Sequence, residues 1–599
     1  MSSNTLDTIL TTSNITALVN SYITDQTSRI ITPITTRQTR YQNLSSAYNT
    51  FSSKLTSLKS LLVDFKIADT TSLFNKKAAA SSDPTFISTS VENSASIGAY
   101  NMRVDQLAKN DVLLSQDIAS SAANALTGTH TFTLKTGDGT NPDFTSNVEV
   151  TFSGSETNQT VMEKIRNAIN TDKAVVQSGT KSASASYTGG PSTFTIDLNG
   201  TETSISVNGG GTYEDLIDEI ASKINSDVSG VSAEKVLDSG TGNVSLKLTV
   251  NNSKNYISVT NTSGNDIVSD LGIGAVKEKG ASGMVTASSF SPASGNTQLS
   301  LTSKETGVNY RIKELSDSGS STALSSLGLN IGASRPAFDQ STEPDTVGFL
   351  YSDISSNSLL NAKLTFNGLS ISRDSNIIDD LVTGVTFNLK ASMQSSDSDV
   401  SVSVANDVKT IESKVQDFIT KFNDIYQFLK TNSSATSSSS SGTTSYTPGV
   451  LSYDSNASSL LSMLRSVAYT RVVGIPTGDM NSLSQIGITF DTSTGLSISD
   501  TAAFEQKVNE NSDQVAALFN STDGLANTLY NQIDPYLGVS GYLTIKKNSY
   551  NSNITSLSDK ITAAQDRINK SADSLRSQYE KLQSQLAEMI SMQNMISYL

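Results

Sequence analysis

The sequence predicts an α+β multidomain protein, with long terminal helices forming a coiled-coil or helical-bundle leg and β-rich head domains inserted between them. Three observations lead to this fold class. Apolar residues recur in steps of three and four near both ends, which is the spacing of a packed helix. The middle alternates apolar and polar residues in short runs separated by Gly, Asn and Ser, which is typical of strands and turns. The chain has 599 residues, several times the length that one hydrophobic core supports.

The first long helix is predicted from residue 34 onward. Pro33 lies just before it, where a helix start tolerates proline. Ile15, Val19 and Ile23 belong to a shorter amphipathic piece, which Pro33 is expected to separate from the main helix. We therefore expect a mobile N-terminal segment over 1–33 and a coiled-coil helix over 34–75. The apolar positions of its heptad seam are Tyr41, Leu44, Tyr48, Phe51, Leu55, Leu58, Leu62 and Phe65.

The middle of the chain, from about residue 74 to 389, reads as β-rich and contains an internal repeat. A pattern of three apolar residues and an asparagine occurs twice, 55 residues apart, as Val161, Ile165, Ile169, Asn170 and as Leu216, Ile220, Ile224, Asn225. Each set is expected on a short helix that follows a strand and a polar turn. The repeat predicts related β-plus-helix units over 121–274, inserted into a β-rich head domain made of 76–120 and 275–400.

Two further helices with the same spacing are predicted in the last third of the chain. One begins at Asn406 or Asp407, either of which can cap it, within a helical leg domain over 401–540. A Ser-rich stretch over 431–447 is expected to be a flexible loop because it has little to bury. The other is a coiled-coil helix over 541–599. Its apolar seam positions are Ile554, Leu557, Ile561, Ile568, Leu575, Leu582, Met589, Met592 and Ile596.

The terminal stripes favour packing between long helices. A single apolar stripe can equally face the core of its own domain. A terminal helix of roughly 45 residues is too long for one small domain to cover, so a pair of such helices at opposite ends predicts partner helices. Ser571, Gln578 and Gln585 occupy the C-terminal seam as well, and these polar residues are expected to weaken the coil.

Composition excludes several classes of chemistry. The net charge is −15 without a block of like charge, which argues against nucleic acid as a partner. Cysteine is absent and His130 is the single histidine, so a histidine triad or a multi-histidine metal site is excluded. No apolar run approaches roughly 18 residues, and the start does not read as a Sec-type signal. We expect no enzyme, no catalytic residue, no metal, no cofactor and no membrane insertion.

One stretch carries a family resemblance. Between Ala362 and Phe387 the chain has Asn-Gly at Asn367, then Arg-x-Ser-Asn from Arg373, then Gly-Val-Thr from Gly384. This order closely resembles the filament cap protein of the bacterial flagellum, the FliD or hook-associated protein 2 family. Segments 74–83, 98–108, 486–498 and 515–519 are similar to other parts of the family pattern and follow in the same order.

The resemblance implies a structural cap at the distal end of the bacterial flagellar filament. Such a protein is secreted by the flagellar type III export apparatus with a cytoplasmic export chaperone, and it lies outside the cell at the flagellum tip. It forms a homo-oligomeric ring, promotes flagellin polymerisation and prevents loss of flagellin monomers. Two alternatives stay open: an exported adhesin that binds host surface glycans through its β domains, and another axial protein of the hook-filament junction.

Overall fold

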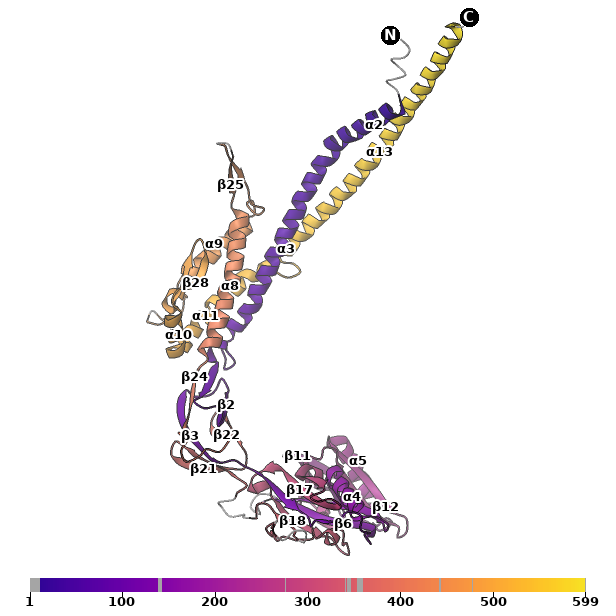
Figure 1. Ribbon diagram of the computed structural model, residues 1–599, viewed down its shortest axis with the longest axis vertical. Coiled ribbons are helices and arrows are strands. Elements are labelled where there is room, and N and C mark those ends of the chain that lie inside the picture. Colours follow the sequence, from indigo (N-terminus) through magenta and orange to yellow (C-terminus); the bar gives the residue numbers. More distant parts are fainter. Residues whose placement is uncertain are drawn as a thin grey trace. The chain divides into compact units, whose positions relative to one another are not determined.

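The structure is a computed structural model that describes residues 11–137, 143–274, 276–339, 341, 346–352, 359–440, 443–476 and 478–597. The chain divides into two compact units, shown in Figure 1. The helical unit comprises Met1–Ala78, Glu92–Ser94 and Ala405–Leu599, and the β-rich unit comprises Ala79–Val91 and Ala95–Val404. Long helices near both ends and β-rich regions between them confirm the predicted α+β multidomain class.

The helical unit is built from long helices of the two chain ends and a set of shorter ones. Its longer helices are α2 (Thr12–Gln26), α3 (Thr32–Lys66), α8 (Val408–Ser433), α9 (Ser455–Tyr469), α10 (Thr501–Glu510), α11 (Ser512–Asn520), α12 (Leu525–Ile533) and α13 (Tyr542–Ser597). Its short elements are η1 (Thr27–Ile31), η2 (Leu73–Asn75), η6 (Leu483–Ile486), η7 (Asp534–Tyr536), β25 (Thr436–Ser440), β26 (Thr443–Thr447), β27 (Ile488–Asp491) and β28 (Gly495–Ile498).

The core of the helical unit is aromatic where α3, α8 and α11 meet. The ring centroid of Phe65 lies 5.3 Å from that of Phe519, 5.8 Å from that of Phe418 and 5.9 Å from that of Phe74. All four side chains are fully buried. Offset and tilted ring pairs of this kind add to the stabilisation that burial alone provides.

The expected break at Pro33 is instead a continuous helical path. Residues Thr27–Ile31 form a single π-helical turn, η1, and Pro33 lies in the first turn of α3. The backbone N–H of Thr32 donates to the carbonyl of Thr27, five residues earlier. This wider turn accommodates Pro33, which has no N–H to donate and whose ring would crowd a regular α-helical turn. Residues 1–10 of the predicted N-terminal segment lie outside the described part of the chain.

The structure decides two local predictions near α8, the residue that caps the helix and the conformation of the Ser-rich stretch after it. Of the two candidate caps, Asp407 accepts from the Thr410 N–H at 3.0 Å, whereas the Asn406 side chain donates to the carbonyl of Asn509 at 3.0 Å. The Ser-rich stretch after α8 is not a plain loop, because β25 and β26 pair there in an antiparallel hairpin. Backbone pairing between two polar segments therefore replaces the flexible loop that composition predicted.

The described residues of the β-rich unit form five sheets. Its strands are β1 (Lys77–Ser81), β2 (Ile87–Val91), β3 (Gly98–Gln106), β4 (Asn110–Leu114), β5 (Ile118–Ala119), β6 (Thr127–Thr136), β7 (Phe144–Ser153), β8 (Val175–Gln177), β9 (Lys181–Ser182), β10 (Ser192–Leu198), β11 (Thr201–Val207), β12 (Val231–Asp238), β13 (Asn243–Val250), β14 (Tyr256–Gly264), β15 (Lys277–Lys279), β16 (Val285–Phe290), β17 (Asn296–Thr306), β18 (Ile312–Asp317), β19 (Gly348–Phe349), β20 (Ala362–Phe366), β21 (Leu369–Arg373), β22 (Ile377–Val382), β23 (Val385–Leu389) and β24 (Val400–Asn406). Its helices are α4 (Asn158–Thr171), α5 (Tyr213–Asp227), α6 (Ile267–Asp270), α7 (Ala281–Met284), η3 (Val308–Tyr310) and η4 (Ser325–Leu327).

In the part of the unit that the structure describes, these sheets enclose three separate apolar cores. The sheets β1-β24-β3-β20-β21 and β2-β23-β22 share one core. A second core lies beneath α4 and includes residues of β6, β7, β16 and β17. A third lies beneath α5 and includes residues of β10, β12, β13 and β14. The seven-stranded sheet β11-β10-β14-β15-β7-β6-β18 runs through both of the latter two regions.

The repeat in the sequence is a repeat in the fold. Asn170, at the end of α4, donates to the carbonyl of Ala287 at 2.8 Å and accepts from the N–H of Ala287 at 2.9 Å. Asn225, at the end of α5, makes the same two bonds to Ala233, at 2.8 and 2.9 Å. Each asparagine therefore fastens its helix to a strand of its own copy through both amide atoms.

A serine repeats in the same way. The N–H of Ser115 donates to the Leu299 carbonyl while the Ser115 Oγ accepts from the Leu299 N–H, each at 2.9 Å. Ser178 makes the equivalent bonds to Leu246, at 2.9 and 2.8 Å. The first copy thus spans 110–171 and 285–331, and the second copy, 174–273, is inserted between its helix α4 and its strand β16.

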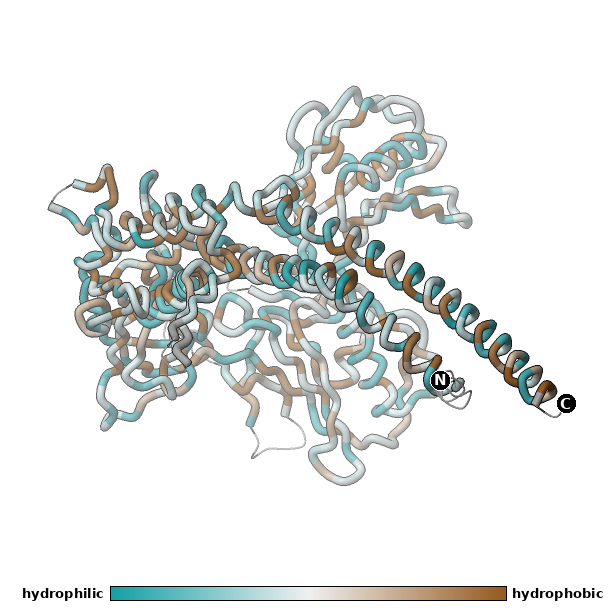
Figure 2. The backbone as a smooth tube through the Cα atoms, turned by 90° about the horizontal axis from the view of Figure 1, so that it is seen from above, coloured by the Kyte–Doolittle hydropathy of each residue, from teal (hydrophilic) through white to brown (hydrophobic). Residues whose placement is uncertain are grey.

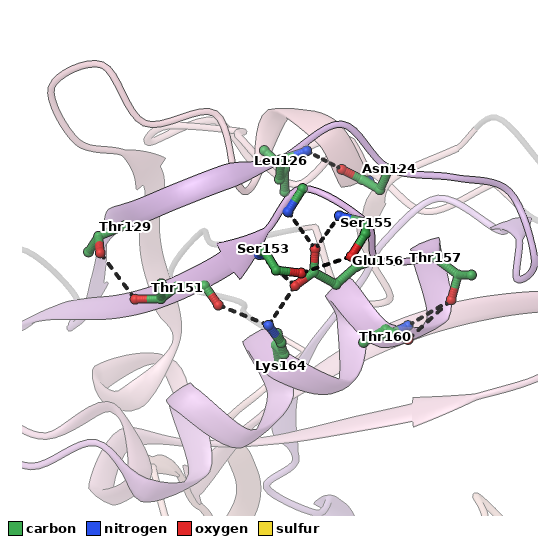
Figure 3. Close-up of polar contacts among 11 residues, drawn as sticks. Asn124, Leu126, Thr129, Thr151, Ser153, Ser155, Glu156, Thr157, Thr160 and Lys164 are labelled. Carbon is green, nitrogen blue, oxygen red and sulfur yellow. Dashed lines mark hydrogen bonds and ion pairs between the residues drawn. The ribbon is translucent and has the colours of Figure 1, made fainter.

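The turn before each helix shows how the copies differ. In the first copy the Glu156 carboxylate accepts from the N–H groups of Ser153, Gly154 and Ser155 at 2.7, 2.9 and 3.1 Å (Figure 3). Lys164 donates to Glu156 at 2.6 Å and, with the Ser153 N–H, holds the pKa of Glu156 far below its usual range. These bonds fix the chain direction at the start of α4.

The second copy closes the same turn with different residues at the two equivalent positions. Gly211 and Glu219 stand 55 residues after Glu156 and Lys164. Glu219 reaches back from α5 and accepts from the Asn208 N–H at 3.0 Å. The carboxylate therefore comes from the helix in one copy and from the turn in the other, and the glycine run at 209–211 is a turn of the fold.

Candidate assembly surface

The candidate site is the paired terminal helices of the helical unit. In Figure 1, α13 runs beside α3 and then beside α2. Hydrophobic segments recur along both helices in Figure 2. The pairing begins with aromatic contacts, since the Tyr41 ring stacks on that of Tyr550 at 5.8 Å and the Tyr48 ring lies 5.5 Å from it.

A buried polar cluster ties the two helices to α9. Asp454 caps α9 by accepting from the N–H groups of Asn456 and Ala457 at 2.9 and 3.1 Å. Its other oxygen accepts from the Tyr542 hydroxyl at 2.9 Å and from the Tyr48 hydroxyl. Burial, reinforced by the bond to Asp454, raises the pKa of Tyr48, so its hydroxyl stays a donor. One carboxylate thus joins α3, α9 and α13.

Farther along the pair, small apolar clusters replace the aromatic ones. Ile31 of η1 packs with Ala564 and Ile568 of α13. Ile15 and Val19 of α2 pack with Ala572. The remaining contacts of this second cluster come from partly buried side chains, namely Tyr22, Ile23, Tyr579 and Leu586.

The structure places the predicted α3 seam inside the helical unit. Its residues from Tyr48 to Phe65 are buried in the main core, among α8, α9, α11 and α12. Tyr41 and Leu44 are partly exposed. These eight positions therefore share one helix face, and most of that face is covered within the chain.

The predicted α13 seam is covered at first and exposed farther on. Leu557 and Ile568 are buried, while Ile554, Ile561 and Leu575 are half-buried. Four later seam positions are exposed: Leu582 at 44%, Met589 at 59%, Met592 at 53% and Ile596 at 73%. We call these four residues the outer stripe.

The outer stripe is exposed because the residues of α13 that contact α2 no longer occupy the predicted heptad positions. Buried positions step by four from Ala564 to Ile568 and by four again to Ala572, where the heptad expects Ser571. Tyr579 and Leu586 continue the contact line. Two successive steps of four rotate the covered face away from the heptad positions. Ala572, Tyr579 and Leu586 do not belong to the predicted heptad seam, and a helical period of 3.6 residues instead of 3.5 would have indicated them.

Among the described residues, no three His, Cys, Asp or Glu side chains come together in a way that could hold a metal ion. Nor does a helix in the described part of the chain have the length and apolar character needed to cross a membrane.

Comparison with protein families identifies the chain's relatives. The model described as "Flagellar hook-associated protein 2 C-terminus" matches residues 360–591, and the model for the N-terminus of the same protein matches residues 11–111. The chain belongs to the flagellar hook-associated protein 2 family. The C-terminal match includes all of α8 to α12 and the outer stripe residues Leu582 and Met589.

Individual relatives agree with this family. The B-type flagellar hook-associated protein 2 of Pseudomonas aeruginosa is 25% identical over 355 residues, which is 58% of this chain and 69% of that protein. The A-type protein of Pseudomonas aeruginosa is 23% identical over 283 residues, covering 47% of this chain and 56% of the relative. The match thus spans only about half of the second relative's length.

Two solved structures are similar to parts of the chain. The D1-D2-D3 domains of the flagellar cap protein FliD from Escherichia coli match with a TM-score of 0.44 and 18% identity, over 84% of this chain and 99% of theirs. FliD (HAP2) from Pseudomonas aeruginosa PAO1 matches with a TM-score of 0.25 and 18% identity, over 59% of this chain and 100% of its own.

Proposed function

We propose that this protein is a structural, non-enzymatic cap at the distal end of a bacterial flagellar filament. Copies of the chain form an oligomeric ring there, promote flagellin polymerisation and prevent the loss of flagellin monomers. The observation that supports this proposal is the outer stripe of α13, an apolar face on a terminal helix that the described part of the chain leaves exposed. Membership of the hook-associated protein 2 family supports it independently.

The outer stripe has the chemistry of a helix-packing surface. Its members follow heptad spacing, so they share one face along several turns. Contiguous exposed apolar side chains on a soluble protein usually mark an interaction site. Each such side chain contributes about 1.5–3 kcal/mol when it becomes fully buried. A few per subunit are therefore comparable with association costs of roughly 4–15 kcal/mol.

This surface and the family support the proposed partners. The outer stripe fits the apolar face of another long helix, either of a second copy or of flagellin. The cap function places the protein outside the cell, so it requires passage through the flagellar export apparatus and a cytoplasmic chaperone. Ser571, Gln578 and Gln585, which the heptad placed in the seam, are instead exposed beside the contact line of Ala572, Tyr579 and Leu586, so they do not weaken the pairing of α13 with α2.

The experiment is complementation of a strain that lacks the gene. Flagellin in the culture medium and filament length report capping. We expect the wild-type chain to restore filaments and Met589→Asp to leave flagellin in the medium, since a charge on the outer stripe opposes helix packing. Ser591→Asp is the matched control, because Ser591 is also exposed but lies two residues on, roughly 160° around the helix. Normal filaments in the deletion strain itself would refute the cap function.

A further inference from the structure

The chain passes twice between the two copies of the repeat. It leaves the first copy after α4, at 172–174, and returns through 276–284, which contain β15 and α7. Strand β15 pairs with β14 of the second copy on one side and, in parallel, with β7 of the first copy on the other. This three-residue strand therefore joins two halves of the seven-stranded sheet.

The two crossings are bound to each other through Asp172. Its carboxylate accepts from the Ala281 N–H at 2.6 Å and from the Ser146 hydroxyl. Its backbone carbonyl accepts from the Ser282 hydroxyl. The segments approach so closely that a Cβ on Gly280 would lie 2.7 Å from the Asp172 carbonyl oxygen. The hydrogen bonds of one aspartate thus hold the return segment against the exit segment.

A second acid, Glu278, lies beside this contact. Glu278 is opposite Thr145 in the pairing of β15 with β7 and is only 8% exposed. Together with Asp172 it lines a cleft of about 840 Å³. Among the described residues, no ion pair joins a lysine or arginine to either acid. We call Asp172 and Glu278 the junction pair.

The other charged groups around the cleft are engaged elsewhere or lie at its margin. Lys247 of β13 pairs with Glu234 at 3.1 Å, and Lys277 lies 3.9 Å from Asp197. Lys279 stands over the Phe144 ring at 4.9 Å, and burial lowers its pKa. The remaining charged residues that line the cleft are Glu149 of β7 and Lys173 of the exit segment.

The surroundings favour the protonated form of Glu278. Burial raises the pKa of Glu278 to about 7, and the nearby Asp172 carboxylate adds to the rise. Burial also raises the pKa of Asp172, against the lowering effect of its hydrogen bonds. The repeat supplies the contrast, since Asp227 stands 55 residues after Asp172, at the end of α5, and is exposed. At this position of the repeat, the acid is therefore half-buried in the first copy and exposed in the second.

We propose that the junction pair makes the connection between the two copies proton-dependent. The connection is tight while Glu278 carries a proton and opens more often once Glu278 is ionised. The tight connection raises the pKa of Glu278, so protonation of Glu278 stabilises it. This stabilisation of the tight connection is complete below the usual glutamate pKa of about 4.3 and is lost as the pH rises through about 7. This inference does not depend on the proposed cap function.

Hydrogen exchange on the full chain tests the inference. Protection of the amides of 276–284, corrected for the intrinsic exchange rate, is measured from pH 5 to pH 8. We expect protection in the wild type to fall at least about tenfold across this range, as linkage to one strongly shifted acid requires. Glu278→Gln keeps the side-chain shape and is expected to vary less than about twofold, because the acid whose pKa is raised to about 7 is removed.

Two further variants separate the junction pair from general effects of pH. Asp172→Asn removes the neighbouring charge and is expected to move the loss of protection to lower pH. Asp227→Asn, at the equivalent exposed position of the second copy, is expected to behave as the wild type. Protection that does not change with pH in the wild type, or that falls equally in Glu278→Gln, would overturn the inference. If Glu278→Gln does not fold, an unmoved midpoint in Asp172→Asn overturns it instead.

Discussion

The root and the tip of the terminal helix pair share one sequence pattern but differ in their surroundings. At the root, α3 from Tyr48 to Phe65 lies among α8, α9, α11 and α12, and its seam is buried. At the tip, α13 beyond Ala572 packs with α2, and the outer stripe stays exposed. Heptad spacing therefore decides which residues share a face, whereas the number of neighbouring elements decides whether that face is covered.

The largest effect is expected at the root. Phe65→Ala removes a fully buried ring that contacts Phe74, Phe418 and Phe519, so it leaves a cavity in the aromatic core. We expect the free energy of unfolding of the helical unit to fall by about 3–5 kcal/mol. Chemical denaturation followed by circular dichroism measures this change.

Val63→Ala is the control for that experiment. Val63 lies two residues earlier on α3 and is 49% exposed. Its truncation is expected to change the free energy of unfolding by less than about 1 kcal/mol. Equal losses in the two variants would mean that the root is not more tightly packed than an exposed helix face.

A smaller effect is expected where the root meets the polar cluster. Tyr48→Phe removes one of the two tyrosine hydroxyls that donate to the buried carboxylate of Asp454. Tyr542 and the α9 N–H groups still satisfy Asp454, so the unfolding free energy is expected to fall by about 1–2 kcal/mol. Tyr41→Phe keeps the ring stacked on Tyr550 and is expected to stay within about 0.5 kcal/mol. A neutral Tyr48→Phe would show that the hydroxyl does not hold the root together.

The features that the sequence predicts correctly are those whose residue pattern lies within one helix or one short segment. The spacing of apolar residues placed α3, α8 and α13, and the repeated asparagines placed α4 and α5. The motifs of residues 362–387 indicated the family. Each of these patterns is local, so it can be recognised in one sequence without knowledge of the tertiary structure.

Other features depend on partners far apart in the chain. The π-helical turn η1 and the step from Ile568 to Ala572 reflect how α2 and α13 fit together, which a heptad template does not contain. The insertion of the second copy appears only when β4 pairs with β17, almost 190 residues later. The junction pair could not be predicted from the sequence for the same reason. Asp172 and Glu278 belong to no motif, and the insertion of the second copy brings them together in one cleft.

The smallest effect on stability is expected at the tip. It distinguishes a buried heptad position of α13 from an exposed heptad position of the same helix. Leu582→Ser changes an exposed member of the outer stripe, so the unfolding free energy is expected to stay within about 0.5 kcal/mol. Leu557→Ser changes a buried seam residue of the same helix and is expected to lower it by about 2–4 kcal/mol. Light scattering of the purified full chain then tests the tip, because Leu582→Ser is expected to shift the mass toward the monomer despite unchanged stability. A wild-type mass distribution in Leu582→Ser would show that the outer stripe, although exposed, is not where copies meet.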